Sequence, residues 1–174
     1  MKKTLEVIIE LKNKGLIKNY AIGGAIGVLK WTEPFFTRDL DIFIITEEVQ
    51  NQKLIVLSPI YEYLKKRGYT EWIGQWIIIE GIPVEFIPTT DALTVESIEN
   101  AVETEYEDIK TRVMTPEYLI ALLLKAGRNK DKIKIEMLLK QAEIDNDKLQ
   151  KILDKYELAE KFDNFLKELQ NEQF

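Results

Sequence analysis

Two aspartates, Asp39 and Asp41, stand two residues apart at the start of an apolar run that ends at Ile45. In a β-strand, side chains at positions i and i+2 leave the same face, so both carboxylates are expected to project together. Gly23 and Gly24 precede the run and allow the backbone there to approach another group closely. Two carboxylates that converge in this way indicate a site for a divalent metal ion.

A third acid, Glu85, lies in the apolar segment formed by residues 81–87. If that segment is a neighbouring strand, it can bring Glu85 to the same place as the aspartates. A carboxylate among apolar neighbours needs a partner when it is buried, and a metal ion is one such partner. Three acids beside a backbone that tolerates phosphate are typical of nucleotidyl or phosphoryl transfer.

The composition supports this chemistry by elimination. The chain of 174 residues contains neither cysteine nor histidine. These absences exclude Ser-His-Asp and Cys-His mechanisms, disulfides and thiolate metal sites. The ligands that remain are hard oxygen atoms, which suit Mg²⁺ or Mn²⁺.

Charge and hydropathy limit the partners and the location. The net charge of −6 argues against a broad surface that coats nucleic acid. A local basic groove is available at Lys125 and Arg128 and at the next three lysines, Lys130, Lys132 and Lys134, although we interpret those three as a solvated helix face. The chain shows no signal-peptide core and no apolar stretch of membrane-spanning length, so we expect no membrane partner and a cytoplasmic location.

The pattern of apolar residues, glycines and prolines predicts an α+β fold with strands and helices in the first part of the chain and a helical carboxy-terminal region. Ser58 and Pro59 give a capping hydroxyl followed by proline, which predicts that a helix begins there. The expected strands cover residues 20–22, 39–45, 69–73, 76–80 and 82–87, the last three as a meander, with a short edge segment at 108–114. The expected helices cover the amino-terminal residues up to Gly15 and residues 25–31, 58–67, 91–102, 118–127, 131–142, 147–156 and 158–172.

The order of these elements resembles the nucleotidyltransferase superfamily. In that family a Gly-Gly or Gly-Ser turn precedes a strand with an Asp-x-Asp pattern, and a later strand gives a third acid. The matching segments here are residues 22–24, 37–44 and 84–86. Residues 115–119 and 125–131 are similar to elements of the AbiEii-like branch, whose members include toxins of toxin–antitoxin systems.

The resemblance implies a nucleotidyltransferase-like catalytic domain at residues 1–114, with a mixed sheet flanked by helices, and a helical region packed on it at residues 115–174. It implies a Mg²⁺- or Mn²⁺-dependent enzyme that moves a nucleoside monophosphate from a nucleoside triphosphate to an acceptor hydroxyl, such as an RNA end. An antitoxin protein is the partner implied by the AbiEii-like branch. The implied roles are catalysis and metal binding for Asp39, Asp41 and Glu85, and nucleotide binding for Gly23, Gly24, Lys125 and Arg128.

Two residues depart from the pattern of that family. Gly24 stands where many members have serine, so the backbone has to hold phosphate without a side-chain hydroxyl. Glu85 stands where aspartate is frequent, which adds a methylene to the reach of the third metal ligand.

Alternatives remain at two levels. Arg128 lies three residues before Asp131, so an exposed ion pair of little energetic value is the alternative to a phosphate contact. For the whole protein, the alternatives are a non-catalytic module that binds a nucleotide or a partner, and a nucleotidyltransferase with a small-molecule acceptor. The presence of three acids argues against the non-catalytic module, because carboxylates without a cation repel one another.

Overall fold

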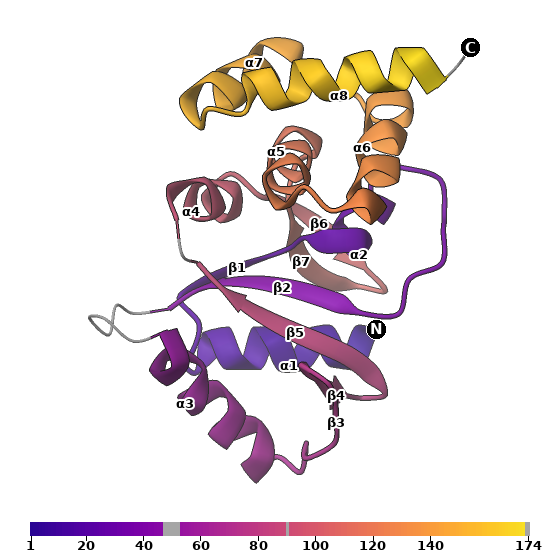
Figure 1. Ribbon diagram of the computed structural model, residues 1–174. Helices are drawn as coiled ribbons and strands as arrows, with labels where there is room; N and C mark the ends of the chain where they lie inside the picture. The colour runs from indigo at the N-terminus through magenta and orange to yellow at the C-terminus, as the bar shows by residue number, and fades with distance from the viewer. Residues whose placement is uncertain (47–52, 90, 173–174) are drawn as a thin grey trace.

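Figure 1 shows the computed structural model, which describes residues 1–46, 53–89 and 91–172. A sheet crosses the middle of the molecule, and helices lie on both of its faces. The strands are β1 (Asn19–Ile22), β2 (Leu40–Ile45), β3 (Trp72–Ile73), β4 (Trp76–Ile79), β5 (Ile82–Pro88), β6 (Val102–Tyr106) and β7 (Ile109–Val113). The helices are α1 (Lys2–Asn13), α2 (Gly24–Leu29), α3 (Lys53–Lys66), α4 (Ala92–Glu99), α5 (Pro116–Ala126), α6 (Asn129–Gln141), α7 (Asn146–Lys155) and α8 (Ala159–Glu172).

The sheet is mixed, and the two strands that carry the predicted acids are neighbours in it. The strand order is β3-β4-β5-β2-β1-β7-β6. β2 pairs with β5 in parallel and with β1 in antiparallel orientation, and β1 pairs with β7 in parallel. β3, β4 and β5 form the antiparallel meander that the glycine-punctuated sequence predicts. A mixed sheet flanked by helices confirms the predicted α+β fold class.

The burial pattern of β2 decides which way its acids face. Leu40, Ile42 and Ile44 are fully buried, and they belong to a hydrophobic cluster with α1 and α3, which lie below the sheet in Figure 1. Burial of each of these side chains contributes roughly 1.5–3 kcal/mol, which holds the strand in this register. The alternate side chains of β2 are half-buried and face the opposite layer, where α2, α4 and α5 lie.

The carboxy-terminal helices pack on the side of the sheet that carries the acids. A second hydrophobic cluster joins Ala21 of β1 and Val28 of α2 to buried residues of α4 and of α5 to α8. Figure 1 shows α7 and α8 as the outermost layer, beyond α5 and α6. The division of the chain after Met114 into two domains stays a prediction, and residues 173–174 of the predicted helical region lie outside the described residues.

The helix before the meander begins earlier than predicted. α3 starts at Lys53 and contains Pro59, so the predicted start at Ser58 is wrong. Proline inside a helix removes a hydrogen bond and costs about 3 kcal/mol. The side chains of Ile60 and Leu64, which follow the proline on one helix face, are fully buried in the cluster beneath the sheet and offset this cost.

The segment after α4 also differs from the prediction. α4 ends at Glu99, and Val102–Tyr106 forms the edge strand β6, which displaces β7 from the predicted edge position to a place between β6 and β1. β6 and β7 are joined by a two-residue turn in which Glu107 and Asp108 have φ values of 47° and 68°. Two-residue hairpin turns with positive φ at both positions are usually Asn-Gly, Asp-Gly or Gly-Gly. Because Glu107 and Asp108 form none of these pairs, the sequence carries little signal for this hairpin.

Across the described residues, no helix combines the length and the apolar character that crossing a membrane requires.

Candidate active site

Asp41 and Glu85 are cross-strand partners. They occupy matching positions in the parallel pairing of β2 with β5, where neighbouring strands lie about 4.8 Å apart. Side chains at matching positions leave the same face, so both carboxylates point to the side that the carboxy-terminal helices cover. Asp39 precedes β2 by one residue and lines the same cleft as the other two acids. The structure therefore brings the three predicted acids together.

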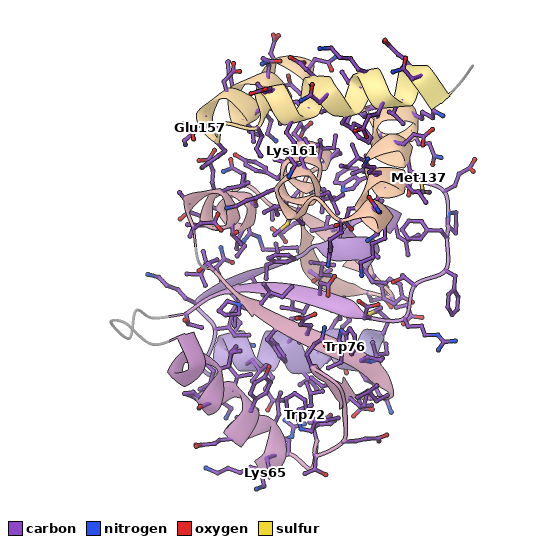
Figure 2. All side chains as sticks on the ribbon, in the orientation of Figure 1. Lys65, Trp72, Trp76, Met137, Glu157 and Lys161 are labelled. Carbon is purple, nitrogen blue, oxygen red and sulfur yellow. The ribbon has the colours of Figure 1, made fainter. Side chains whose placement is uncertain are left out.

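The cleft has a volume of about 630 Å³, which is ample for a nucleotide. The three acids line it together with Gly24. Its walls come from three segments that are distant in sequence: the loop between α2 and β2, the β3–β4 turn, and α6. In Figure 2, Trp76 of β4 lies at the level of the sheet and Met137 projects from α6 above it, and both line the cleft.

The charge on Asp41 is destabilised in this arrangement. Burial raises the pKa of Asp41 to about 6, and the negative charges of Asp39 and Glu85 add to the increase. Lys134 and Arg128 line the same cleft, and their positive charges lower the pKa of Asp41. The cleft thus holds three acids that repel one another and two cations that relieve part of the repulsion.

The glycine pair lets the start of α2 approach Asp41. Gly24 has a φ of +54°, and a Cβ atom built on it would lie 1.7 Å from Asp41 Oδ2. A Cβ atom on Gly23 would lie 2.5 Å from the Phe43 ring. The Gly23 amide donates a hydrogen bond to the Asp41 carbonyl oxygen at 3.1 Å. Both glycines are therefore required for packing against the strand that carries the aspartates.

Arg128 and Lys134 are held by one buried carboxylate. Asp131 is 1% exposed and accepts hydrogen bonds from Arg128 Nε at 2.6 Å and from Lys134 Nζ at 3.1 Å. The ion pair considered from sequence is therefore present, with its carboxylate buried and its arginine side chain 57% exposed. The interpretation of Lys134 as a solvated residue is wrong, because its side chain is only 16% exposed. In the sequence, the spacing of three between Arg128, Asp131 and Lys134 was the pattern that indicated this contact, because residues three apart are neighbours on a helix.

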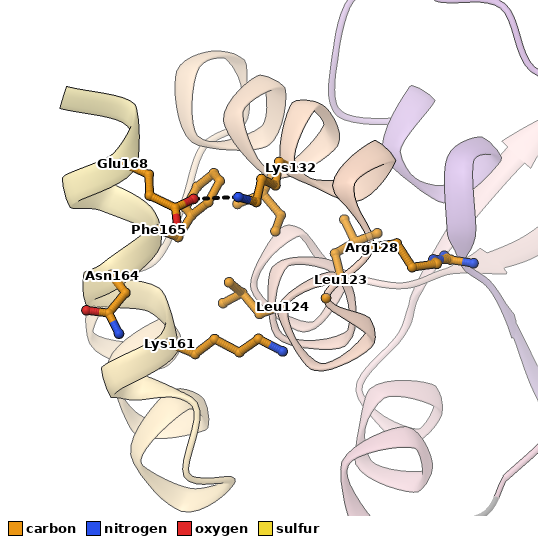
Figure 3. A pocket seen from close by; sticks show the side chains of 10 residues that line it. Leu123, Leu124, Arg128, Lys132, Lys161, Asn164, Phe165 and Glu168 are labelled. Carbon is orange, nitrogen blue, oxygen red and sulfur yellow. Dashed lines mark hydrogen bonds and ion pairs between the residues drawn. The ribbon is translucent and has the colours of Figure 1, made fainter. Parts of the chain in front are cut away.

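Lys125 does not join this group. Its ammonium pairs with Asp91 Oδ2 at 3.0 Å, at the beginning of α4, and Lys125 is absent from the lining of the cleft. Lys132 pairs with Glu168 of α8, and Figure 3 shows this pair in a separate small pocket between α5, α6 and α8. Arg128 lines that pocket as well as the cleft, and in Figure 3 its side chain extends away from Lys132.

Comparisons with known proteins bear on this arrangement. Residues 1–171 match the family described as "Nucleotidyl transferase of unknown function (DUF2204)". The chain belongs to this family. A comparison with curated protein sequences finds no match.

Two solved structures share the fold of this nucleotidyltransferase family member. One is an antigenic nucleotidyltransferase-like protein from Paracoccidioides brasiliensis, with a TM-score of 0.56 and 15% identity, over 94% of this chain and 90% of the other. The second is the antibiotic-resistance factor ANT(2'')-Ia, with a TM-score of 0.52 and 15% identity, over 90% and 91% of the two chains. At this level of identity the likeness shows the fold.

The mouth of the cleft in this family member carries apolar side chains that the sequence did not single out. Phe36 is 81% exposed and Ile133 is 64% exposed, although both line the cleft. The Arg38 guanidinium lies over the Phe36 ring at 5.2 Å from its centroid. Nearby, the Trp76 indole N–H is buried without a hydrogen-bond partner. Exposed apolar surface of this kind is typical of a place that a ligand covers.

The three acids have the donor chemistry of a divalent-metal site. Carboxylate oxygens are the ligands that Mg²⁺ and Mn²⁺ prefer, and the mutual repulsion seen at Asp41 is the condition that a cation relieves. In the part of the chain that is described, however, no group of three acidic side chains is already arranged to hold a metal ion. The residues fit such an ion by type and by face, while their side chains are not closed around one point.

Proposed function

We propose that this protein is a metal-dependent nucleotidyltransferase, which moves a nucleoside monophosphate from a nucleoside triphosphate to an acceptor hydroxyl and releases pyrophosphate. The observation that carries the proposal is the meeting of Asp39, Asp41 and Glu85 with Arg128 and Lys134 in one cleft. The acids suit metal ions, the cations suit a triphosphate, and this transfer requires both. Membership of a nucleotidyl transferase family supports the reaction class.

The three acids are the proposed ligands of Mg²⁺ or Mn²⁺. A metal bound there would activate the attacking hydroxyl and neutralise negative charge that develops at phosphorus. Glu85 is also the proposed acceptor of the hydroxyl proton, since the chain has no histidine for this task.

The nucleotide is proposed to lie with its phosphates between the acids and α6. The backbone of Gly23 and Gly24 adjoins Asp41, which supports a place for the triphosphate beside the metal ligands. Arg128 and Lys134 are the proposed phosphate contacts from α6. The proposal for Lys125 has less support, because its ammonium pairs with Asp91 outside the cleft.

An RNA end is the proposed acceptor. Among the described residues that line the cleft, the only acids are the three proposed metal ligands, whereas Arg38 and Lys130 add positive charge to that of Arg128 and Lys134. This balance favours an anionic acceptor over a cationic small molecule. The exposed ring of Phe36 offers a surface on which an unpaired base can stack. A small-molecule acceptor remains the second candidate, because the fold is shared with an antibiotic-resistance factor.

We also propose that the protein is the toxin of a toxin–antitoxin pair in the cytoplasm. The resemblance of residues 115–119 and 125–131 to the AbiEii-like branch supports this role. Transfer of nucleotides to an essential RNA would then arrest growth, and an antitoxin protein would prevent it. Induced expression in a bacterial host tests this role. Growth arrest by the wild-type protein and normal growth with Asp41→Asn is the expected result, and equal growth with both would remove the toxin role.

The decisive experiment is incubation of the purified protein with Mg²⁺ and each labelled nucleoside triphosphate, with total RNA or with a panel of hydroxyl-bearing small molecules. The expected result is labelled RNA together with stoichiometric pyrophosphate. Label on a small molecule would support the second candidate. Nucleotide binding without pyrophosphate would support the non-catalytic module and overturn the proposed function.

The matched control is Asp41→Asn, which keeps the shape of the side chain and removes its charge. We expect it to fold and to lose transfer. Full activity in this variant would contradict the assignment of the site.

A further inference from the structure

Asp131 is a buried carboxylate that contacts two cations of the cleft. It lies in the first turn of α6 and is 1% exposed. Arg128 donates to it through Nε at 2.6 Å and through Nη2 at 3.3 Å, and Lys134 donates through Nζ at 3.1 Å. Two bonds from one guanidinium fix the plane of the Arg128 head group, and the bond from Lys134 fixes the direction of its ammonium.

The position of Asp131 explains why such a group can be buried. A buried carboxylate is stable when charged partners and hydrogen bonds replace water. Asp131 has two cationic partners, and its place in the first turn of a helix favours negative charge. Arg128 is the residue before the helix, with extended backbone, so its side chain folds back to meet Asp131 one turn later.

Both partners of Asp131 face the three acids. Arg128 and Lys134 line the cleft together with Asp39, Asp41 and Glu85. The hydrogen bond that Arg128 donates to Asp131 is the largest cause of the raised pKa of Arg128, and the charges of Asp41 and Glu85 add to the increase. Lys134 is 16% exposed and Arg128 is 57% exposed, so the lysine forms the inner part of the cationic pair and the arginine the outer part.

We propose that Asp131 is a positioning residue, which holds Arg128 and Lys134 as one fixed cationic pair for the β- and γ-phosphates of the nucleotide. This inference rests on the proposed function. Asp131 itself does not touch the nucleotide in this arrangement and acts through the two cations.

The physical reason is preorganisation. Two neighbouring cations repel each other, and long side chains lose conformational freedom when they are held in place. Asp131 balances one of the two charges and supplies this order before the nucleotide arrives. Without Asp131, the Arg128 guanidinium and the Lys134 ammonium would turn toward water, and the triphosphate would have to order them during binding. Removal of Asp131 should therefore weaken the binding of ligands that carry the β- and γ-phosphates.

The test compares Asp131→Asn with Glu117→Gln. Glu117 is the matched control, because it is also a buried carboxylate, 4% exposed, with a lysine partner, Lys148, at 3.1 Å, and it lies outside the cleft. The measurement is the dissociation constant of a labelled nucleoside triphosphate and of the matching monophosphate, with Mg²⁺ and without an acceptor, together with the melting temperature of each variant.

Asp131→Asn is expected to weaken triphosphate binding at least about tenfold and monophosphate binding less than about twofold. Glu117→Gln is expected to lower the melting temperature while the ratio of the two constants stays as in the wild type. An unchanged ratio in Asp131→Asn, or an equal change in both variants, would show that Asp131 only stabilises the fold and would overturn the proposal.

A second variant, Asp131→Glu, tests the proposal if Asp131→Asn does not fold. Asp131→Glu keeps the charge and moves it by a methylene, so it is expected to fold and to lower the preference for triphosphate at least about threefold. An unchanged preference in Asp131→Glu would overturn the proposal. If the wild-type protein binds no triphosphate at all, the proposed function itself fails, which is a different result from a wild type that binds and a variant that binds equally well.

Discussion

The Asp41 carboxylate lies against Gly24 so closely that a Cβ atom at position 24 would stand 1.7 Å from Asp41 Oδ2. This contact accounts for the glycine at position 24, because a side chain there would displace an acid that lines the cleft. The family resemblance implies that the glycine pair binds the nucleotide. The structure adds a second role for Gly24, which is to leave room for the Asp41 carboxylate.

Gly24→Ala is predicted to move the Asp41 carboxylate and to reduce transfer by about a hundredfold, since small displacements of reacting groups are costly. It should also lower stability by about 1–2 kcal/mol, because φ is +54° at this position. Pyrophosphate release and thermal melting measure the two effects. Gly15→Ala is the control, as Gly15 has a φ of +73° and a Cβ atom built on it would have no other atom within 4 Å. It should lose similar stability and keep its activity, and retention of activity in both variants would contradict the prediction.

Asp41→Asn is predicted to raise the stability of the metal-free protein at neutral pH. The pKa of Asp41 rises from its ordinary value of 3.8 to about 6 in the folded protein, so the folded state holds this proton more tightly than the unfolded chain. That contribution to stability is complete below pH 4 and is lost as the pH rises through 6. The variant, which cannot ionise, should be more stable by about 3 kcal/mol at pH 7.5 and should match the wild type near pH 3.5. Chemical denaturation at both pH values in EDTA would measure the difference, and an equal difference at both would argue against the burial of this charge.

Magnesium is predicted to stabilise the wild-type protein and to do so more strongly at pH 7.5 than at pH 5. Metal binding needs an ionised Asp41, and its raised pKa keeps that carboxyl largely protonated at the lower pH. At a metal concentration 100 times the dissociation constant, the gain would be about 2.7 kcal/mol. Thermal melting with Mg²⁺ and after chelation gives the measurement. Glu85→Gln should show a reduced shift, and a shift as large as that of the wild type would remove Glu85 from the proposed ligands.

Lys134→Met is predicted to raise the KM for the nucleoside triphosphate more than Lys125→Met does. Lys134 lines the cleft and its charge acts on Asp41, whereas Lys125 pairs with Asp91. A lost charge-assisted hydrogen bond to phosphate corresponds to about 1.5–3 kcal/mol, or roughly ten- to a hundredfold in affinity. Steady-state kinetics of both variants give the comparison. A larger effect at Lys125 would restore the assignment made from the sequence resemblance.

Local sequence patterns were sufficient to predict which face of each strand carries the acids. Alternation along a strand has a period of two, so the spacing of Asp39 and Asp41 and the buried residues between and after them determined the face on which the aspartates lie. The same local rule oriented Glu85 against Val84 and Phe86. The glycine-punctuated meander also followed from short-range signals. Pro59 gave a wrong start for α3, because a helix accepts proline when its buried face offsets the energetic cost. The sequence did not predict the β6–β7 turn, because the turn lacks glycine and asparagine.

Tertiary structure decided the rest, since it depends on which distant segments meet. The parallel register that sets Asp41 opposite Glu85 is a pairing across more than forty residues, which no local pattern contains. The sequence by itself determined that acids, glycines and a basic helix were present and which way each strand faces. The packing of α6 over the sheet placed Lys134, and not Lys125, in the lining of the cleft. The same packing buried Asp131 between its two cations. Burial and charge pairing depend on the assembled core, so the sequence by itself did not reveal them.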